Sequence, residues 1–259
     1  MLDWYRAAGV DLAVGETPVN RFAAAPAVPH PRAAAPATVP AASAGTAEVP
    51  VAAAAAAPAE PQALAAQARN MDELRAIMDA YDGCGLKLRA TQLCFADGNP
   101  EAEVMLVGEA PGSEEDVQGR PFVGKAGQLL DRMLGAIGLD RSSVFIVNTV
   151  PWRPPGNREP SPEEMALCRP FLLRQIELAA PRLLVTLGNV PTKALFSTSL
   201  GITRMRGQWQ ELTLGSHRVR ALPTLHPAYL LRQPASKQLA WRDMLSLRQA
   251  LDPEKSARD

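Results

Sequence analysis

Hydrophobic residues occur along this chain in two distinct patterns. Continuous apolar runs, typical of strands buried on both faces of a parallel sheet, lie at 104–107, 144–150, 183–187 and around 219–225. Apolar residues at helical spacing lie between these runs, at 126–137, 161–180 and 190–196. Strands that alternate with helices predict an α/β fold, a three-layer sandwich in which a central, mainly parallel four-stranded sheet has helices on both faces.

Further helical patterns flank this region. A pair of short helices is predicted before the first strand, over 64–68 and 71–81, because apolar residues there recur every three or four positions. A final helix is predicted from about 236 to 251. Its expected apolar face is formed by Trp241, Leu245 and Leu247 and is extended by Ala240, Met244 and Leu251.

The N-terminal quarter of the chain has a different composition. Of the 36 residues in 23–58, 18 are alanine and seven are proline, so prolines interrupt every candidate helix and little apolar surface can offset the entropy of ordering. We therefore expect 23–58 to be a disordered linker. The large apolar residues in 1–22 fit either a short helix that docks on a protein partner or on the domain itself, or a frayed terminus. The folded domain is expected over 59–252, with a polar tail at 253–259.

Charge and cysteine content exclude several classes of protein. The 27 basic and 27 acidic side chains cancel, so a polyanion would bind to a local patch rather than to a uniformly basic surface. Three cysteines are too few for a disulfide scaffold, which indicates either a reducing compartment or a site that uses single thiols. The sequence shows neither an apolar run long enough to span a membrane nor a signal-peptide pattern. We expect a cytoplasmic monomer that does not bind membranes.

Polar and aromatic residues follow or end each predicted strand. Gly108–Gly112 follows the first run and Asn148 lies near the end of the second. Gly188 and Asn189 follow the third run, and His226 and Tyr229 follow the fourth. Each of these alone has an ordinary explanation as a turn or loop residue. The carboxyl ends of parallel strands meet at one edge of a sheet, where ligand crevices form. Together these residues fit a site for one small planar ring.

The same residues belong to a series of motifs in a fixed order. The series is Gly108–Gly112 with Glu115 and Asp116, then Gly119–Gly127, Asn148, Arg153–Arg158 and His226–Ala228. It resembles the uracil-DNA glycosylase superfamily, closest to its family four, over about residues 70–250. The resemblance implies hydrolysis of the N-glycosidic bond of uracil in DNA, which leaves an abasic site for repair. It implies uracil-containing DNA as the partner and no redox cofactor or catalytic metal.

The resemblance also implies how the base is bound. Phe122 matches the phenylalanine that stacks on a flipped base, and the Asn148 amide can pair with O4 and N3–H of uracil but not with the reversed pattern of cytosine. His226 matches the histidine that reaches uracil O2, where negative charge develops as the bond breaks. The substrate-binding residues implied are Gly108, Ala110, Pro111, Phe122, Asn148 and His226.

Two carboxylates are candidates for orienting the water that attacks the sugar. Glu109 is the first choice, because it stands beside Ala110 where the superfamily's classical enzymes carry a water-binding aspartate. Glu115 matches a second acidic position of family four, and the two could share the task. Alternatively, Glu115 is only an acidic residue in the first turn of a helix. With His226, these are the candidate catalytic residues.

Contacts to the DNA backbone are expected from basic residues in loops near the strand ends. The candidates are Lys125, Arg153, Arg158, Arg204, Arg206, Arg232 and Lys237. Leu230 and Leu231 resemble the superfamily's wedge loop, which fills the space left by a flipped base. The alternative for these leucines is that they begin the last helix inside the core.

The cysteines depart from the family-four pattern. That family normally holds a four-iron cluster on four cysteines, and Cys84 and Cys168 match only two of those positions, while Tyr81 and Trp152 occupy the other two. Cys94 lies in an apolar, strand-like context, and three thiolates rarely hold such a cluster. We therefore expect no metal and no cofactor, with Tyr81 and Trp152 filling the space by packing.

Two other functions fit parts of the sequence. The first is a protein that binds uracil-containing or abasic DNA with little turnover, because the same pocket would serve it. The second, a nucleotide-binding module, fits less well, because Gly108–Gly112 lacks the Lys-Ser/Thr that a phosphate-binding loop requires.

Overall fold

The computed structural model of this protein describes residues 60–252. The predictions for 1–22, 23–58 and 253–259 lie outside the described residues. Within the described part of the chain, no helix is both long and apolar enough to cross a membrane.

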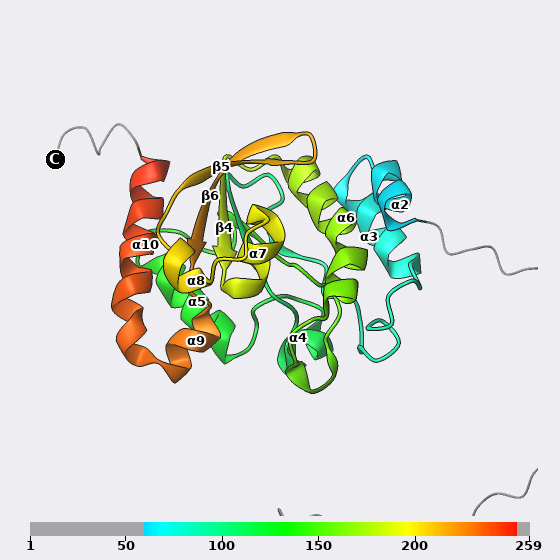
Figure 1. The fold of residues 1–259 in the computed structure, drawn as a ribbon, viewed down its shortest axis with the longest axis horizontal. Helices are drawn as coiled ribbons and strands as arrows, with labels where there is room; N and C mark the ends of the chain where they lie inside the picture. The colour runs from blue at the N-terminus through cyan, green and yellow to red at the C-terminus, as the bar shows by residue number, and fades with distance from the viewer. Residues whose placement is uncertain (1–59, 253–259) are drawn as a thin grey trace, which may run out of the picture. The chain divides into compact units, whose positions relative to one another are not determined.

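A six-stranded mixed sheet forms the centre of the fold (Figure 1). Its strand order is β1-β3-β2-β4-β6-β5. The strands are β1 Asp97–Gly98, β2 Val104–Gly108, β3 Val144–Asn148, β4 Leu183–Leu187, β5 Gln210–Leu214 and β6 His217–Thr224. The four in the middle are parallel, whereas β1 and β5 pair antiparallel at the two edges.

The α/β class is thus confirmed, but the prediction of a four-stranded sheet is wrong. The two additional strands lack the continuous apolar run on which that prediction depended. The first, β1, has only two residues, and β5 alternates between more and less exposed positions as an edge strand does.

Helices cover both faces of the sheet. The helical elements are α2 Pro61–Gln67, α3 Met71–Ala80, α4 Ser113–Gln118, α5 Lys125–Gly135, η1 Pro155–Asn157, α6 Pro162–Ala179, α7 Asn189–Phe196, α8 Ile202–Met205, α9 Pro227–Arg232, η2 Pro234–Ser236 and α10 Lys237–Leu251. The longest, α6, begins with a capping box in which Ser161 and Glu164 each bind the other's backbone N–H.

Successive residues of each central strand belong to different hydrophobic layers. In β2, Val104 and Leu106 pack with residues of α5 and α10, whereas Met105 and Val107 pack with residues of α6 and α7. Side chains alternate between the two faces of a strand, so a run without polar residues requires an apolar layer on each side. The continuous apolar runs are therefore explained by two-sided burial.

A third hydrophobic cluster joins the N-terminal helices to α6. Tyr81 and Trp152 are buried in it beside Cys84 and Cys168. The Tyr81 ring centroid lies 5.1 Å from that of Phe171 and 6.4 Å from that of Trp152. Aromatic packing thus occupies this region.

The predicted face of the last helix is only partly right. Leu247 is buried, but Trp241 and Leu245 are each 42% exposed. Ala240 and Met244, which were predicted to extend this face, are buried with Leu247 and form the face of α10 that packs on the domain. Positions 240, 244 and 247 lie on one stripe of a helix, and the other two residues lie beside it.

Candidate active site

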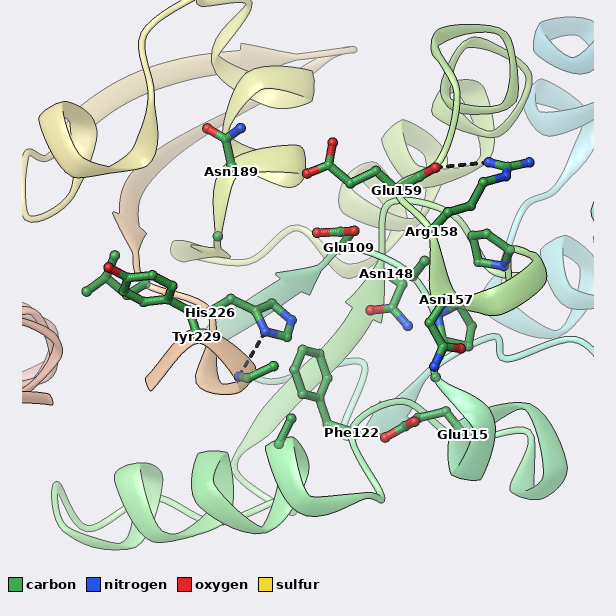
Figure 2. A pocket seen from close by; sticks show the side chains of 18 of the residues that line it. Glu109, Glu115, Phe122, Asn148, Asn157, Arg158, Glu159, Asn189, His226 and Tyr229 are labelled. Atoms are coloured by element: carbon green, nitrogen blue, oxygen red, sulfur yellow. Dashed lines mark hydrogen bonds between the residues drawn. The ribbon is translucent and has the colours of Figure 1, made fainter. Parts of the chain in front are cut away.

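A pocket of about 660 Å³ lies at the carboxyl ends of the parallel strands (Figure 2). Its walls come from the segments after β2, β4 and β6, from the last residue of β3 and from the loop between β3 and α6. Glu109, Phe122, Asn148 and His226 all line it. In the sheet, β3 lies on one side of β2 and β4 on the other, so the strand order reverses at β2. Such a reversal opens a crevice in an open α/β sheet.

Glu109 lies directly after β2 on a fixed backbone. Its carbonyl accepts a hydrogen bond from Val150 N at 3.1 Å, and the Gly108 carbonyl accepts one from Thr149 N at 2.9 Å. Within residues 60–252 the Glu109 carboxylate has no hydrogen-bond partner, so it is free to bind water. Burial and the negative charge of Glu159 raise the pKa of Glu109, while Arg232 acts in the opposite direction.

Glu115 lines the same pocket but is engaged with the backbone. Its Oε1 accepts a hydrogen bond from Gly124 N at 2.9 Å, at the residue that caps the N-terminus of α5. A carboxylate at this end of a helix satisfies a backbone donor and interacts favourably with the helix dipole. Glu115 therefore ties α4 to the start of α5, which distinguishes it from Glu109.

Phe122 presents its ring to the pocket from a left-handed backbone. Its φ is +57°, and the side chain is only 5% exposed. The ring centroid lies 5.5 Å from that of His226, and the ring planes are inclined by 31°. Gly108 leaves the necessary room, because a Cβ there would overlap the Phe122 ring and the Asn148 amide. The two rings lie on one side of the pocket (Figure 2).

Asn148 ends β3 and is 5% exposed. Its register partner on β2 is Gly108, so its side chain lies beside the segment that carries Glu109. In the described part of the chain its amide makes no hydrogen bond to the protein, although it lines the pocket. A nearly buried amide with both donor and acceptor unused is suited to reading the edge of a bound ring.

His226 caps the N-terminus of α9. Its Nδ1 accepts a hydrogen bond from Ala228 N at 3.1 Å, which leaves the proton of the neutral ring on Nε2. Burial, with a smaller contribution from Arg232, lowers the pKa of His226 to about 4. Near pH 7 the ring is therefore a neutral hydrogen-bond donor. Gly188, with a φ of +98°, allows the close approach of β4, because a Cβ there would contact His226.

The predicted DNA-contact residues differ in their surroundings. Arg158 and Arg232 line the pocket, although Arg158 also forms two hydrogen bonds with Glu164. Arg153 binds Asn157 through Nε. The remaining exposed candidates are Lys125, Arg204, Leu231 and Lys237.

Arg206 differs from the other candidates. It forms an ion pair with the buried Asp243 and donates to the Leu239 carbonyl at 2.9 Å. Its side chain is 17% exposed and does not line the pocket. Arg206 thus stabilises the packing of α10 rather than offering a free charge to phosphate.

The two candidate wedge leucines differ in their exposure to solvent. Leu230 is buried at 1% exposure, whereas Leu231 is 40% exposed. The core alternative therefore applies to Leu230, and Leu231 remains the candidate wedge.

One charged pocket residue, Glu159, was not predicted. Ala110 and Pro111 line the pocket as expected, and so do Asn189 and Tyr229, which follow predicted strands. Glu159 follows Arg158 beyond η1 in the connection from β3 to α6, so a rule that selects the residues directly after a strand does not reach it. Its position after the Arg-Pro-Pro motif was the available signal.

The fold and this pocket agree with comparisons to known proteins. The sequence model of the Uracil DNA glycosylase superfamily matches residues 95–245, and the chain therefore belongs to that superfamily. A type-4 uracil-DNA glycosylase of Sulfurisphaera tokodaii is 40% identical over 194 residues, 71% of this chain and 88% of the relative. The type-4 enzyme of Thermotoga maritima is 43% identical over 158 residues, 60% of this chain and 79% of the relative. A type-5 enzyme of Pyrobaculum aerophilum is 31% identical over 148 residues, 51% and 64% respectively.

The prediction of no cofactor is contradicted by these relatives, because type-4 glycosylases are a family that usually carries an iron–sulfur cluster. Cys84 and Cys168 are both buried, and the side chain of Cys168 lowers the pKa of Cys84 to about 7. Residues 60–252 contain no group of three or more His, Cys, Asp or Glu side chains placed to hold a metal ion. The described side chains alone therefore do not complete a four-thiolate ligand set.

Proposed function

We propose that this pocket binds a uracil base flipped out of DNA, and that the chain hydrolyses its N-glycosidic bond. The chain is thus a uracil-DNA glycosylase of DNA repair. The observation that carries the assignment is the convergence of a free amide, a neutral histidine donor, an aromatic ring and a free carboxylate in one pocket. These four groups meet the demands of extracting, reading and removing a base.

Base recognition follows from Asn148 and Phe122. The Asn148 amide donates to uracil O4 and accepts from N3–H, while the Phe122 ring stacks on the base. Cytosine presents a donor where uracil has O4 and an acceptor where uracil has N3–H, so a fixed amide would leave two unfavourable contacts. The tight packing of Gly108 under both side chains keeps them fixed.

His226 stabilises the leaving group. When the C1′–N1 bond breaks, its electron pair goes to the uracil ring, and negative charge develops on O2. The Nε2–H of a neutral imidazole donates a hydrogen bond to that oxygen, and this hydrogen bond strengthens as the negative charge on O2 grows. The low pKa keeps the ring in this form throughout the neutral range.

Glu109 orients the attacking water. Its carboxylate is unpartnered in residues 60–252, whereas Glu115 is held by Gly124 N, so we assign the water to Glu109 and loop positioning to Glu115. An ionised carboxylate also offsets the positive charge of the sugar at C1′. The water oxygen bonds to C1′, and its proton passes to Glu109.

The test is a multiple-turnover assay with the purified chain and an oligonucleotide that carries one uracil. Alkaline cleavage of the product reveals abasic sites, and an identical oligonucleotide with thymine is the control. We expect many strand breaks per enzyme molecule, at the uracil position only. Stoichiometric binding without strand breaks would instead indicate a uracil-DNA binding protein. The cytoplasmic location is a further proposal, supported by the low cysteine content, and the monomeric state is proposed as well.

A further inference from the structure

The stacking residue Phe122 has a backbone conformation that needs support. A φ of +57° is uncommon for a residue with a bulky side chain, and it persists only where the surroundings determine it. This conformation directs the ring toward His226. What holds the Phe122 backbone therefore also aims the ring.

Arg141 contacts the Phe122 backbone directly. Its Nη2 donates to the Phe122 carbonyl, and its Nη1 lies 3.3 Å from the Pro121 carbonyl. Arg141 precedes β3, at the amino ends of the parallel strands, whereas the pocket lies at their carboxyl ends. The guanidinium thus binds the main-chain carbonyls of residues 121 and 122, and no atom of Arg141 lines the pocket.

Two carboxylates fix the guanidinium in turn. Asp131 on α5 accepts from Arg141 Nε at 2.8 Å, and Asp97 on β1 accepts from Nη1. The Asp97 side chain is 13% exposed and that of Arg141 24%, so the charge-assisted hydrogen bond between these two is partly shielded from water. The planar fork of an arginine can serve all four acceptors at once, which an ammonium group cannot.

Gly127 closes the other side of the same carbonyl. A Cβ at Gly127 would overlap the Phe122 carbonyl oxygen, so the first turn of α5 packs directly against it. The Phe122 carbonyl therefore lies between the backbone of α5 and the Arg141 guanidinium. The enclosed carbonyl belongs to the residue whose ring packs against His226.

We propose that Arg141 is a positioning residue that holds the Phe122 backbone in its left-handed conformation and thereby aims the stacking ring into the pocket. Asp97 and Asp131 anchor it. The inference rests on the proposed function, because it assigns a purpose to the ring. It places a determinant of base binding outside the pocket.

The first test measures the backbone without reference to activity. Hydrogen–deuterium exchange of the full chain should show faster uptake in a peptide covering 119–126 for Arg141→Met, with β2 and β3 unchanged. The matched control is Arg120→Met. Arg120 also pairs with Asp97, but it is 54% exposed and makes no hydrogen bond to the Phe122 carbonyl within the described residues. Unchanged uptake over 119–126, or faster uptake throughout the domain, would refute the proposal.

The second test uses the reaction. Arg141→Met should lower the single-turnover rate of uracil excision and weaken inhibition by free uracil, each about tenfold, as expected for losing one charge-assisted hydrogen bond. Affinity for undamaged DNA should not change. Arg141→Lys should have an intermediate effect, and Arg120→Met almost none.

A double-mutant cycle separates positioning from general stability. If Arg141 acts through the Phe122 ring, Arg141→Met should have little further effect on the rate in a Phe122→Ala background. Additive losses would show that Arg141 has only a general structural role. If the wild-type chain does not excise uracil, the proposed function fails, while the exchange experiment still decides whether Arg141 holds the loop.

Discussion

His226 shows how a single backbone contact prepares a residue for its role. The hydrogen bond from Ala228 N fixes the tautomer, and burial keeps the ring neutral, so no proton need move before Nε2–H can act. We expect His226→Ala to slow the chemical step by roughly 100- to 1,000-fold, as for the loss of one preorganised oxyanion donor. Single-turnover assays measure this. Affinity for DNA should hardly change, and a rate close to wild type would remove His226 from the catalytic residues.

Glu159 should set the pH dependence of Glu109. Burial and the charge of Glu159 raise the pKa of Glu109, which must be ionised to orient water, so activity is lost as the pH falls through this pKa. Glu159→Gln removes the repulsion and lowers the pKa. The acidic limb of the single-turnover pH profile should therefore shift to lower pH.

The control for this prediction is Glu101→Gln. Glu101 is an exposed carboxylate that precedes β2, at the amino ends of the parallel strands and away from the pocket. Its removal changes the net charge by the same amount without approaching Glu109. An equal shift in both variants, or none in Glu159→Gln, would contradict the electrostatic assignment.

Among single residues, the sequence pointed to the pocket where a candidate residue follows or ends a strand. Glu109, Asn148 and His226 could be selected because a buried run ends beside each of them. The ion pair of Arg206 with Asp243 could not be predicted, because the two residues are 37 positions apart and meet only when α10 packs on the sheet. Arg141 was missed for the same reason, since its partners come from three other segments.

At the scale of elements, two-sided burial made the four central strands predictable. Their apolar runs contain few polar positions, such as Asn148 at the end of β3 and Thr186 in β4, because each face meets a helical layer. The edge strands carry no such signal. Pairing by β5 depends on its hairpin with β6, and β1 is defined only by its register with β3. Neither can be read from a local pattern.

Two tryptophans test how packing stabilises these elements. Trp152 is 1% exposed and lies in the cluster that joins α2, α3 and α6, whereas Trp241 on α10 is 42% exposed. Trp152→Ala should lower the free energy of unfolding by about 3–5 kcal/mol, because it leaves a cavity. Trp241→Ala should cost less than about 1 kcal/mol. Denaturant titration of both variants makes the comparison, and similar losses would refute the role assigned to Trp152.

At the scale of the whole molecule, the strand order concentrates the site. Because β3 and β4 lie on either side of β2, their carboxyl ends bring Asn148 and Gly188 next to the segment that carries Glu109. The parallel pattern and the strand-end residues together predicted this convergence. The exact partners of each side chain required the packed structure.

Zero net charge makes DNA binding depend on a few local residues. Each phosphate contact contributes about 0.9 to the slope of log affinity against log salt concentration. Arg232 is exposed at the rim of the pocket, so Arg232→Ala should weaken binding to all sequences and reduce this slope by about one. Arg182 is the control, because it precedes β4 at the amino ends of the parallel strands, away from the pocket, and pairs with Glu103. Fluorescence anisotropy at several salt concentrations should show an unchanged slope for Arg182→Ala. If both variants had the wild-type slope, Arg232 would not contact phosphate.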